Sequence, residues 1–187
     1  MSEEITSSHK KKNELWEWIK ALGIALVLAF LIRTFLFAPF IVEGESMEST
    51  LHNSEKLVVN KAIYFLQDPK PGEIIVFHAE KERDYIKRVI AVEGDTVEVK
   101  SDQLLVNGKV VEEPYLAQSK EQAKQQGEPF FTHDFPPVQI PADHIFVMGD
   151  NRLNSHDSRA IGPVAVSTVV GRAEFTFWPV AGIRLTR

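Results

Sequence analysis

The sequence predicts a mainly β domain, an antiparallel sheet or partly open barrel, that follows one N-terminal membrane-spanning helix. Residues 15–37 form a long apolar segment, and the rest of the chain holds many short apolar runs separated by turn residues. These runs do not alternate with helical segments, so a parallel sheet of βαβ units is not expected. We therefore divide the chain into an N-terminal tail (1–14), an anchor (15–38) and a β domain (39–187).

The predicted anchor is long enough to cross a bilayer. Its uncharged centre, residues 21–32, is too short alone, because a bilayer core needs about 20 helical residues. Apolar residues continue on both sides, and 15–37 would extend roughly 35 Å at about 1.5 Å per residue. Lys20, Arg33, Trp16 and Trp18 suit the two headgroup regions. Lysines at 10–12 and 20 predict a cytoplasmic N-terminus by the positive-inside rule.

Two alternatives compete with an anchor, namely a buried core helix and a cleaved signal peptide. A cleavage site needs small residues at two positions before the cut, and Leu36-Phe37-Ala38 offers leucine at the first of them. Pro39 follows directly. We therefore expect an uncleaved, single-pass anchor in the cell membrane, with the β domain outside the cytoplasm.

The β domain is predicted from its strand and turn signals in chain order. Asn107-Gly108 between two apolar runs indicates a hairpin. Residues 117–127 are polar and are expected to form a surface segment compatible with a short helix. Residues 129–141 contain four prolines and are expected to be irregular. Both segments belong to an insert at about 112–141. The expected strands are residues 57–59, 73–77, 85–92, 95–100, 145–148 and one or two within 164–178.

The composition restricts the possible functions. Lysine and arginine are dispersed in a chain of net charge −5, which argues against nucleic-acid binding. The absence of cysteine excludes disulfides, thiolate metal sites and a cysteine nucleophile. No metal or cofactor is implied.

Ser46, behind the turn residue Gly44, is the candidate nucleophile, and it needs a base to take its proton. Ser155-His156-Asp157 contains all three triad residue types. However, adjacent side chains on an extended chain point apart, and triads are assembled from separate segments. We therefore interpret His156 as a solvated loop residue.

Lys87 is the better candidate base. On a strand it shares one face with Tyr85 and Val89, whereas Arg88 lies on the other face, so one of the two cations falls on a mostly apolar face. Arginine does not deprotonate, so only the lysine is a possible base. Its ordinary pKa of about 10.4 would have to fall, and desolvation can lower a lysine pKa by about 3 to 5 units. A strand lysine is more often a snorkelling edge residue, so this pattern alone leaves both readings open.

Four stretches together resemble the bacterial type I signal peptidases, the Ser-Lys leader peptidases, in their short form with one N-terminal span. The resemblance extends from the anchor to Trp178-Pro179. The stretches are 44–51 (GESMESTL), 71–77 (PGEIIVF), 85–95 (YIKRVIAVEGD) and 149–159 (GDNRLNSHDSR).

The resemblance implies a membrane-bound serine endopeptidase that removes signal peptides from secretory preproteins after small residues at positions −1 and −3. It implies that Ser46 is the nucleophile, that neutral Lys87 is the general base and that Ser155 orients the lysine. The Ser46 backbone N–H would help to hold the oxyanion. Structural support would come from Arg88, Asp150, Asp157 and Arg159, and the substrate pockets from Phe40, Val42, Met47, Leu51, Tyr85 and Ile86.

The chain departs from the family pattern at three positions. Ser49 and Glu93 stand where proline is usual. Gly44 stands where some members have a serine whose hydroxyl helps to hold the oxyanion, so the second oxyanion donor is unidentified.

Two other functions are weighed against this one. A self-cleaving repressor of the same Ser-Lys class lacks the anchor and the 149–159 stretch. A catalytically silent β domain that binds exported chains would not need both Ser46 and Lys87.

Overall fold

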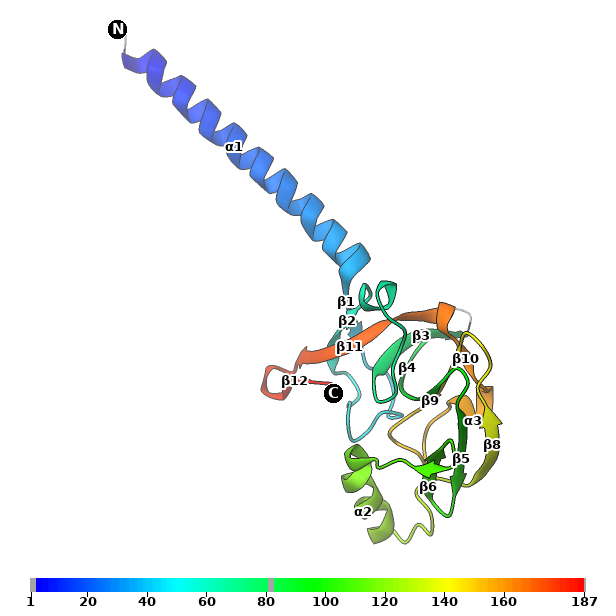
Figure 1. The fold of residues 1–187 in the computed structure, drawn as a ribbon. Helices are drawn as coiled ribbons and strands as arrows, with labels where there is room; N and C mark the ends of the chain where they lie inside the picture. The colour runs from blue at the N-terminus through cyan, green and yellow to red at the C-terminus, as the bar shows by residue number, and fades with distance from the viewer. Residues whose placement is uncertain (1–2, 81–82, 187) are drawn as a thin grey trace. The chain divides into compact units, whose positions relative to one another are not determined.

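The computed structural model describes residues 3–80 and 83–186 and divides the chain into two units, residues 1–37 and 38–187 (Figure 1). The first unit is helix α1 (Glu3–Leu31) followed by a π-helical turn, η1 (Ile32–Leu36). The stretch Glu14–Leu36 has the length and composition of a membrane span, and its side chains are exposed. The helix begins well before the predicted anchor. Residues 1–2 of the predicted tail lie outside the described residues, as do the side chains of the three lysines at 10–12.

The second unit contains one large antiparallel sheet in the order β1-β2-β11-β3-β4-β9-β10, with β12 also paired to β11. This agrees with the mainly β prediction, and each predicted strand is present. The strands are β1 (Phe37–Ile41), β2 (Lys56–Asn60), β3 (Ile74–Glu80), β4 (Arg83–Val92), β9 (His144–Met148), β10 (Val164–Ala165), β11 (Val169–Trp178) and β12 (Arg184–Leu185).

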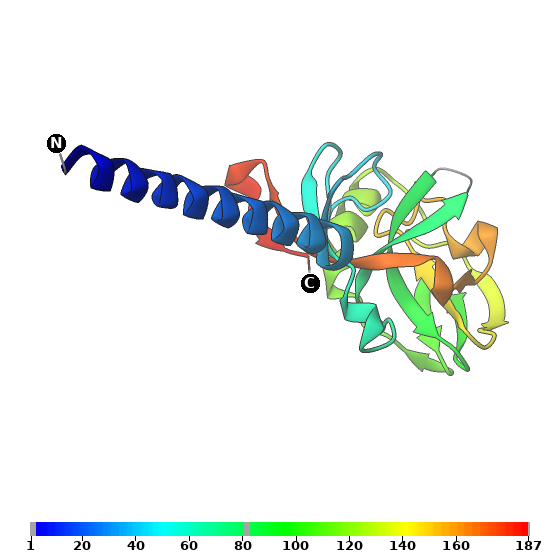
Figure 2. The ribbon, with the colours of Figure 1, turned by 90° about the horizontal axis from the view of Figure 1, so that it is seen from above.

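A smaller sheet runs in the order β7-β6-β5-β8. Its strands are β5 (Thr96–Lys100), β6 (Gln103–Val106), β7 (Lys109–Val110) and β8 (Phe135–Gln139). Asn107 and Gly108 close the predicted hairpin, and both have positive φ, as a tight hairpin turn requires. In Figures 1 and 2 this sheet and β12 lie at opposite sides of the β domain.

The expectation that residues 129–141 are irregular is wrong, because β8 lies within them. Pro136 and Pro137 are exposed and fall at a register shift in the pairing of β8 with β5. β8 is an edge strand, so its outer side has no neighbour that needs a backbone N–H donor. The polar excursion forms helix α2 (Ala117–Gln125), preceded by the 3₁₀ turn η3 (Pro114–Leu116).

The core lies on both faces of the large sheet. β3 is a central strand, and alternate side chains along it enter two clusters. Ile74 and Val76 pack with Leu51 and Leu57, whereas Ile75 and Phe77 pack with Val89 and Val147. This explains why β3 is a continuous apolar run rather than an alternating one. The neighbouring strand β4 contributes Val89 to the second of these clusters.

Candidate active site

Ser46 lies in a turn that begins at Gly44 and precedes the buried residues Met47 and Leu51. Gly44 has φ +88°, which favours glycine, and its N–H donates to Asn53 Oδ1 at 3.0 Å. Asn151 N donates to the Ser46 carbonyl at 3.0 Å, so a second loop holds the serine from the far end of the sequence.

Lys87 lies on β4 with its side chain directed at Ser46. Its Nζ donates to Ser46 Oγ at 2.7 Å and to Ile86 O at 3.0 Å, and it lies 5.2 Å from the centre of the Tyr85 ring. The lysine is only 4% exposed. Once the amine is neutral, the same 2.7 Å contact allows the serine hydroxyl to donate its proton to nitrogen.

The environment of Lys87 favours the neutral amine. Burial lowers the lysine pKa from 10.5 to about 8; the charges of Asp157 and Asp150 oppose this shift, and that of Arg159 adds to it. A pKa of 8 leaves about one lysine in ten neutral at pH 7, compared with fewer than about one in a thousand for a free lysine. The geometry and electrostatics together suit a nucleophile and its base.

Arg88 is buried as well, so both cations of the pair, and not Lys87 alone, are removed from solvent. Its Nε and Nη2 donate to the two carboxylate oxygens of Asp150 at 2.9 and 2.6 Å, and its Nη1 donates to Gly72 O at 2.8 Å. Thr50 Oγ1 donates to the same carboxylate at 2.6 Å. The ion pair therefore ties β4 to the Ser46 segment and to the 149–155 loop.

Asp157, which is fully buried, forms a second ion pair with the partly buried Arg159. Arg159 Nε and Nη2 each donate to an Asp157 oxygen at 2.8 Å, and Gly149 N donates to Asp157 at 2.9 Å. Burial opposes ionisation of Asp157, yet the hydrogen bonds and charge of Arg159 hold its pKa below the ordinary value. The aspartate also caps the short helix α3 (Ser158–Ile161). All four residues expected to give structural support therefore join the loops around Ser46 and Lys87.

Ser155 lies beside this pair but makes no hydrogen bond to Lys87. Its Oγ is buried and finds no hydrogen-bond partner among residues 3–80 and 83–186, although it lies near enough to Asp157 to favour the carboxylate. A Cβ on Gly149 would lie 2.2 Å from this Oγ and 2.3 Å from the Ser46 carbonyl oxygen. Only glycine fits at 149, because Ser155 packs directly against it.

A cleft of about 1000 Å³ opens over Ser46 and Lys87. Segments 39–47 and 83–87 line it, together with Asn53, Asn154 and His156. Five of the six residues expected to form substrate pockets line the cleft: Phe40, Val42, Met47, Tyr85 and Ile86. The expectation for Leu51 is not met, because Leu51 is fully buried in the core and does not reach the cleft.

Two findings extend the sequence reading of the cleft. The exposed His156 ring lies edge-to-face with Tyr85 at 6.4 Å, so His156 is a wall residue rather than an isolated loop side chain. No described residue accepts a hydrogen bond from the Ser46 N–H, which leaves this donor available. The Gly44 N–H is already bonded to Asn53, so it is a poor choice for the second oxyanion donor.

One buried ion pair was missed by the sequence reasoning. Arg152 Nη1 and Nη2 donate to Glu113, and Arg152 Nε donates to Gly149 O at 2.9 Å. The Tyr115 ring lies 3.9 Å from the Arg88 guanidinium. Glu113 and Tyr115 belong to the insert. No local sequence pattern predicts that the insert contacts the loop at 149–152. Within the described residues, no three His, Asp or Glu side chains are grouped so as to hold a metal ion.

The chain is similar to known proteins over most of its length. The family model described as signal peptidase, peptidase S26, matches residues 15–178. A signal peptidase I of Bacillus amyloliquefaciens is 51% identical over 95% of each chain, and one of Bacillus licheniformis is 47% identical over the full length of both. The crystal structure of a signal peptidase I from Enterococcus faecalis V583 has a TM-score of 0.52 and 33% identity, covering 57% of this chain and 97% of that one. The chain therefore belongs to the S26 family of signal peptidases, which are serine peptidases.

Proposed function

We propose that this chain removes signal peptides from secretory preproteins, with Ser46 as nucleophile and neutral Lys87 as general base. The observation that carries the proposal is the 2.7 Å contact between Lys87 Nζ and Ser46 Oγ at the base of the cleft. The lowered pKa of Lys87 supports it, since a base must be partly neutral at working pH.

In the proposed reaction, neutral Lys87 takes the hydroxyl proton while Ser46 Oγ bonds to the carbonyl carbon of the scissile peptide. The Ser46 N–H donates to the oxyanion. The C–N bond then breaks, protonated Lys87 gives its proton to the leaving amine, and an acyl-enzyme ester remains. A water activated by Lys87 hydrolyses the ester and regenerates the serine.

The cleft walls suit an extended peptide with small side chains. Apolar side chains from 40–42 and 85–86 line the same cleft as Ser46. We propose that they accept the small residues at −1 and −3, and that the peptide binds as an added strand. The single span at Glu14–Leu36 would hold the enzyme in the cell membrane, with its N-terminus in the cytoplasm and the β domain outside.

The test is incubation of the full-length protein with a preprotein in detergent. Wild type should release the mature product, whereas Ser46→Ala and Lys87→Met should not. Normal cleavage by either variant would refute the dyad. Failure of folded wild type to cleave any preprotein would instead favour a silent β domain that binds exported chains.

A further inference from the structure

A second cavity, of about 330 Å³, begins where the active-site cleft ends along the nucleophile segment. Glu45, Ser46 and Met47 line the cleft, whereas Glu48 and Ser49, the next two residues, line the second cavity. The two spaces are therefore consecutive along one stretch of backbone.

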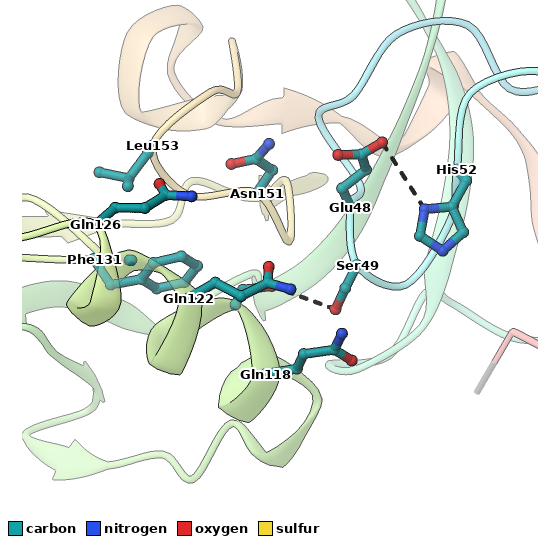
Figure 3. Close-up of a pocket in the computed structure, with 11 residues that line it drawn as sticks. Glu48, Ser49, His52, Gln118, Gln122, Gln126, Phe131, Asn151 and Leu153 are labelled. Atoms are coloured by element: carbon teal, nitrogen blue, oxygen red, sulfur yellow. Dashed lines mark hydrogen bonds and ion pairs between the residues drawn. The ribbon is translucent and has the colours of Figure 1, made fainter. Parts of the chain in front are cut away.

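The opposite wall of this cavity is the insert helix α2. Gln118, Gln122 and Gln126 follow one another at a spacing of four, which sets them along one face, and all three line the cavity (Figure 3). The buried Phe131 ring adds an apolar surface, and Asn151 comes from the loop that also holds Ser46. The wall is thus rich in neutral amides that can both donate and accept hydrogen bonds.

Hydrogen bonds connect the residues that line the cavity to the Ser46 segment. Ser119 Oγ on α2 donates to Ser49 Oγ at 3.3 Å, at the position where the family usually has proline. Asn151 donates from its N–H to Ser46 O and from its Nδ2 to Glu45 O at 3.1 Å. The cavity therefore keeps a fixed position relative to Ser46.

The distance from Ser46 limits which part of a substrate reaches the cavity. Successive Cα atoms are at most about 3.8 Å apart, so Ser49 lies no more than roughly 11 Å from Ser46. An extended peptide advances about 3.3 Å per residue, so the cavity lies no farther along the substrate than about the third or fourth residue from the scissile bond. In the proposed function the residues before the cut lie between segments 39–44 and 83–87. The residues after the cut would then leave along the 46–49 side, where the lining of the cleft ends and that of the second cavity begins.

We propose that this cavity receives a side chain of the mature protein, three or four residues after the cut, and that it favours polar or basic side chains over acidic ones. The inference rests on the proposed function and adds a substrate preference to it. Glu48 is the acidic residue of the lining, and His52, whose Nδ1 lies 3.9 Å from Glu48, is the other ionisable one. The remaining polar lining is neutral and contains no lysine or arginine, so an acidic substrate side chain would meet the carboxylate of Glu48.

The experiment uses full-length enzyme in detergent and one preprotein, varied to Lys, Gln or Glu at the third mature position and, separately, at the fourth. At one of these positions wild type should show a kcat/KM for Lys about two- to fivefold above that for Glu, the range of exposed charge interactions. Gln122→Lys should abolish or reverse the preference. The matched control, Gln125→Lys, adds the same charge to α2 outside the cavity lining and should leave the preference intact. Glu48→Gln should also reduce it.

The failures of the two proposals are distinguishable. Equal cleavage of the Lys and Glu substrates at both positions, or an equal effect of Gln122→Lys and Gln125→Lys, overturns the inference while the cleavage activity stands. Absence of cleavage of every substrate by wild type refutes the proposed function, and the inference falls with it.

Discussion

Replacing Lys87, the proposed base, by methionine should stabilise the protein at neutral pH while removing its activity. In the folded state the pKa of Lys87 is about 8, against 10.5 for the exposed side chain. The difference of 2.5 units corresponds to about 3 kcal/mol, since each unit is about 1.4 kcal/mol. Methionine is similar in length and has no charge to desolvate, so the substitution removes this cost.

The dependence on pH has a definite sign. Above pH 10.5 the lysine is neutral in both the folded and unfolded states, so its burial does not lower the free energy of unfolding. Between 10.5 and 8 the unfolded chain binds a proton that the folded chain does not, so stability falls as pH falls. Below pH 8 the full cost is present. The gain from Lys87→Met should therefore be greatest at pH 7 and should vanish near pH 10.5.

The assay is thermal unfolding of the full-length protein in detergent, followed by the β-sheet circular dichroism signal at pH 7 and pH 10. For a domain of this size, about 3 kcal/mol raises the Tm by roughly 6–12 °C. Lys109→Met, at an exposed lysine of β7, is the control and should change little. A Lys87→Met protein that is less stable than wild type at pH 7, or whose gain is the same at pH 10, would refute a buried base with a lowered pKa.

Three further substitutions test the loops around the site. Gly149→Ala should abolish cleavage and destabilise the domain, because the added Cβ would lie 2.2–2.3 Å from neighbouring atoms. The control Gly182→Ala should be tolerated, since no atom would lie nearer than 3.6 Å to its Cβ. Equal Tm and kcat/KM for the two variants would contradict the packing described at Gly149. Glu113→Gln should lower the free energy of unfolding by about 3–5 kcal/mol, because it leaves the buried Arg152 without its charged partner. Glu112→Gln, at the exposed neighbouring position, should change it little. Chemical denaturation of the two variants compares these values. Ser155→Ala should change the Tm little, since its buried hydroxyl loses at most a weak contact with Asp157, while kcat falls sharply and the pH profile shifts. An unchanged kcat would exclude an orienting role.

The sequence predicts this fold well where local signals decide it. Alternating or continuous apolar runs correspond to β2, β3, β4, β5 and β9, and Asn107-Gly108 predicts the β6–β7 hairpin because both residues tolerate positive φ. β8 is not predicted from the sequence, because prolines normally argue against a strand. They are tolerated in β8 because it is an edge strand, and which strand lies at an edge depends on the whole sheet.

The candidate site is predictable to a different extent. The pairing of Ser46 with Lys87 follows from a resemblance, whereas the burial of both Lys87 and Arg88 depends on a core that surrounds β4 on two faces. Leu51 shows the limit of the resemblance, since a residue five positions after Ser46 can turn into the core. The pair Glu113–Arg152 joins segments 39 residues apart, and only the folded structure brings them together.

The central claim is that Lys87 acts as a neutral base toward Ser46, and the pH dependence of kcat/KM on a preprotein tests it most directly. Burial lowers the lysine pKa to about 8, so log kcat/KM should rise with a slope of one from pH 6 and level off just above pH 8. A profile that is flat from pH 5 to 11, or one that continues to rise to the ordinary lysine pKa near 10.5, would contradict the account.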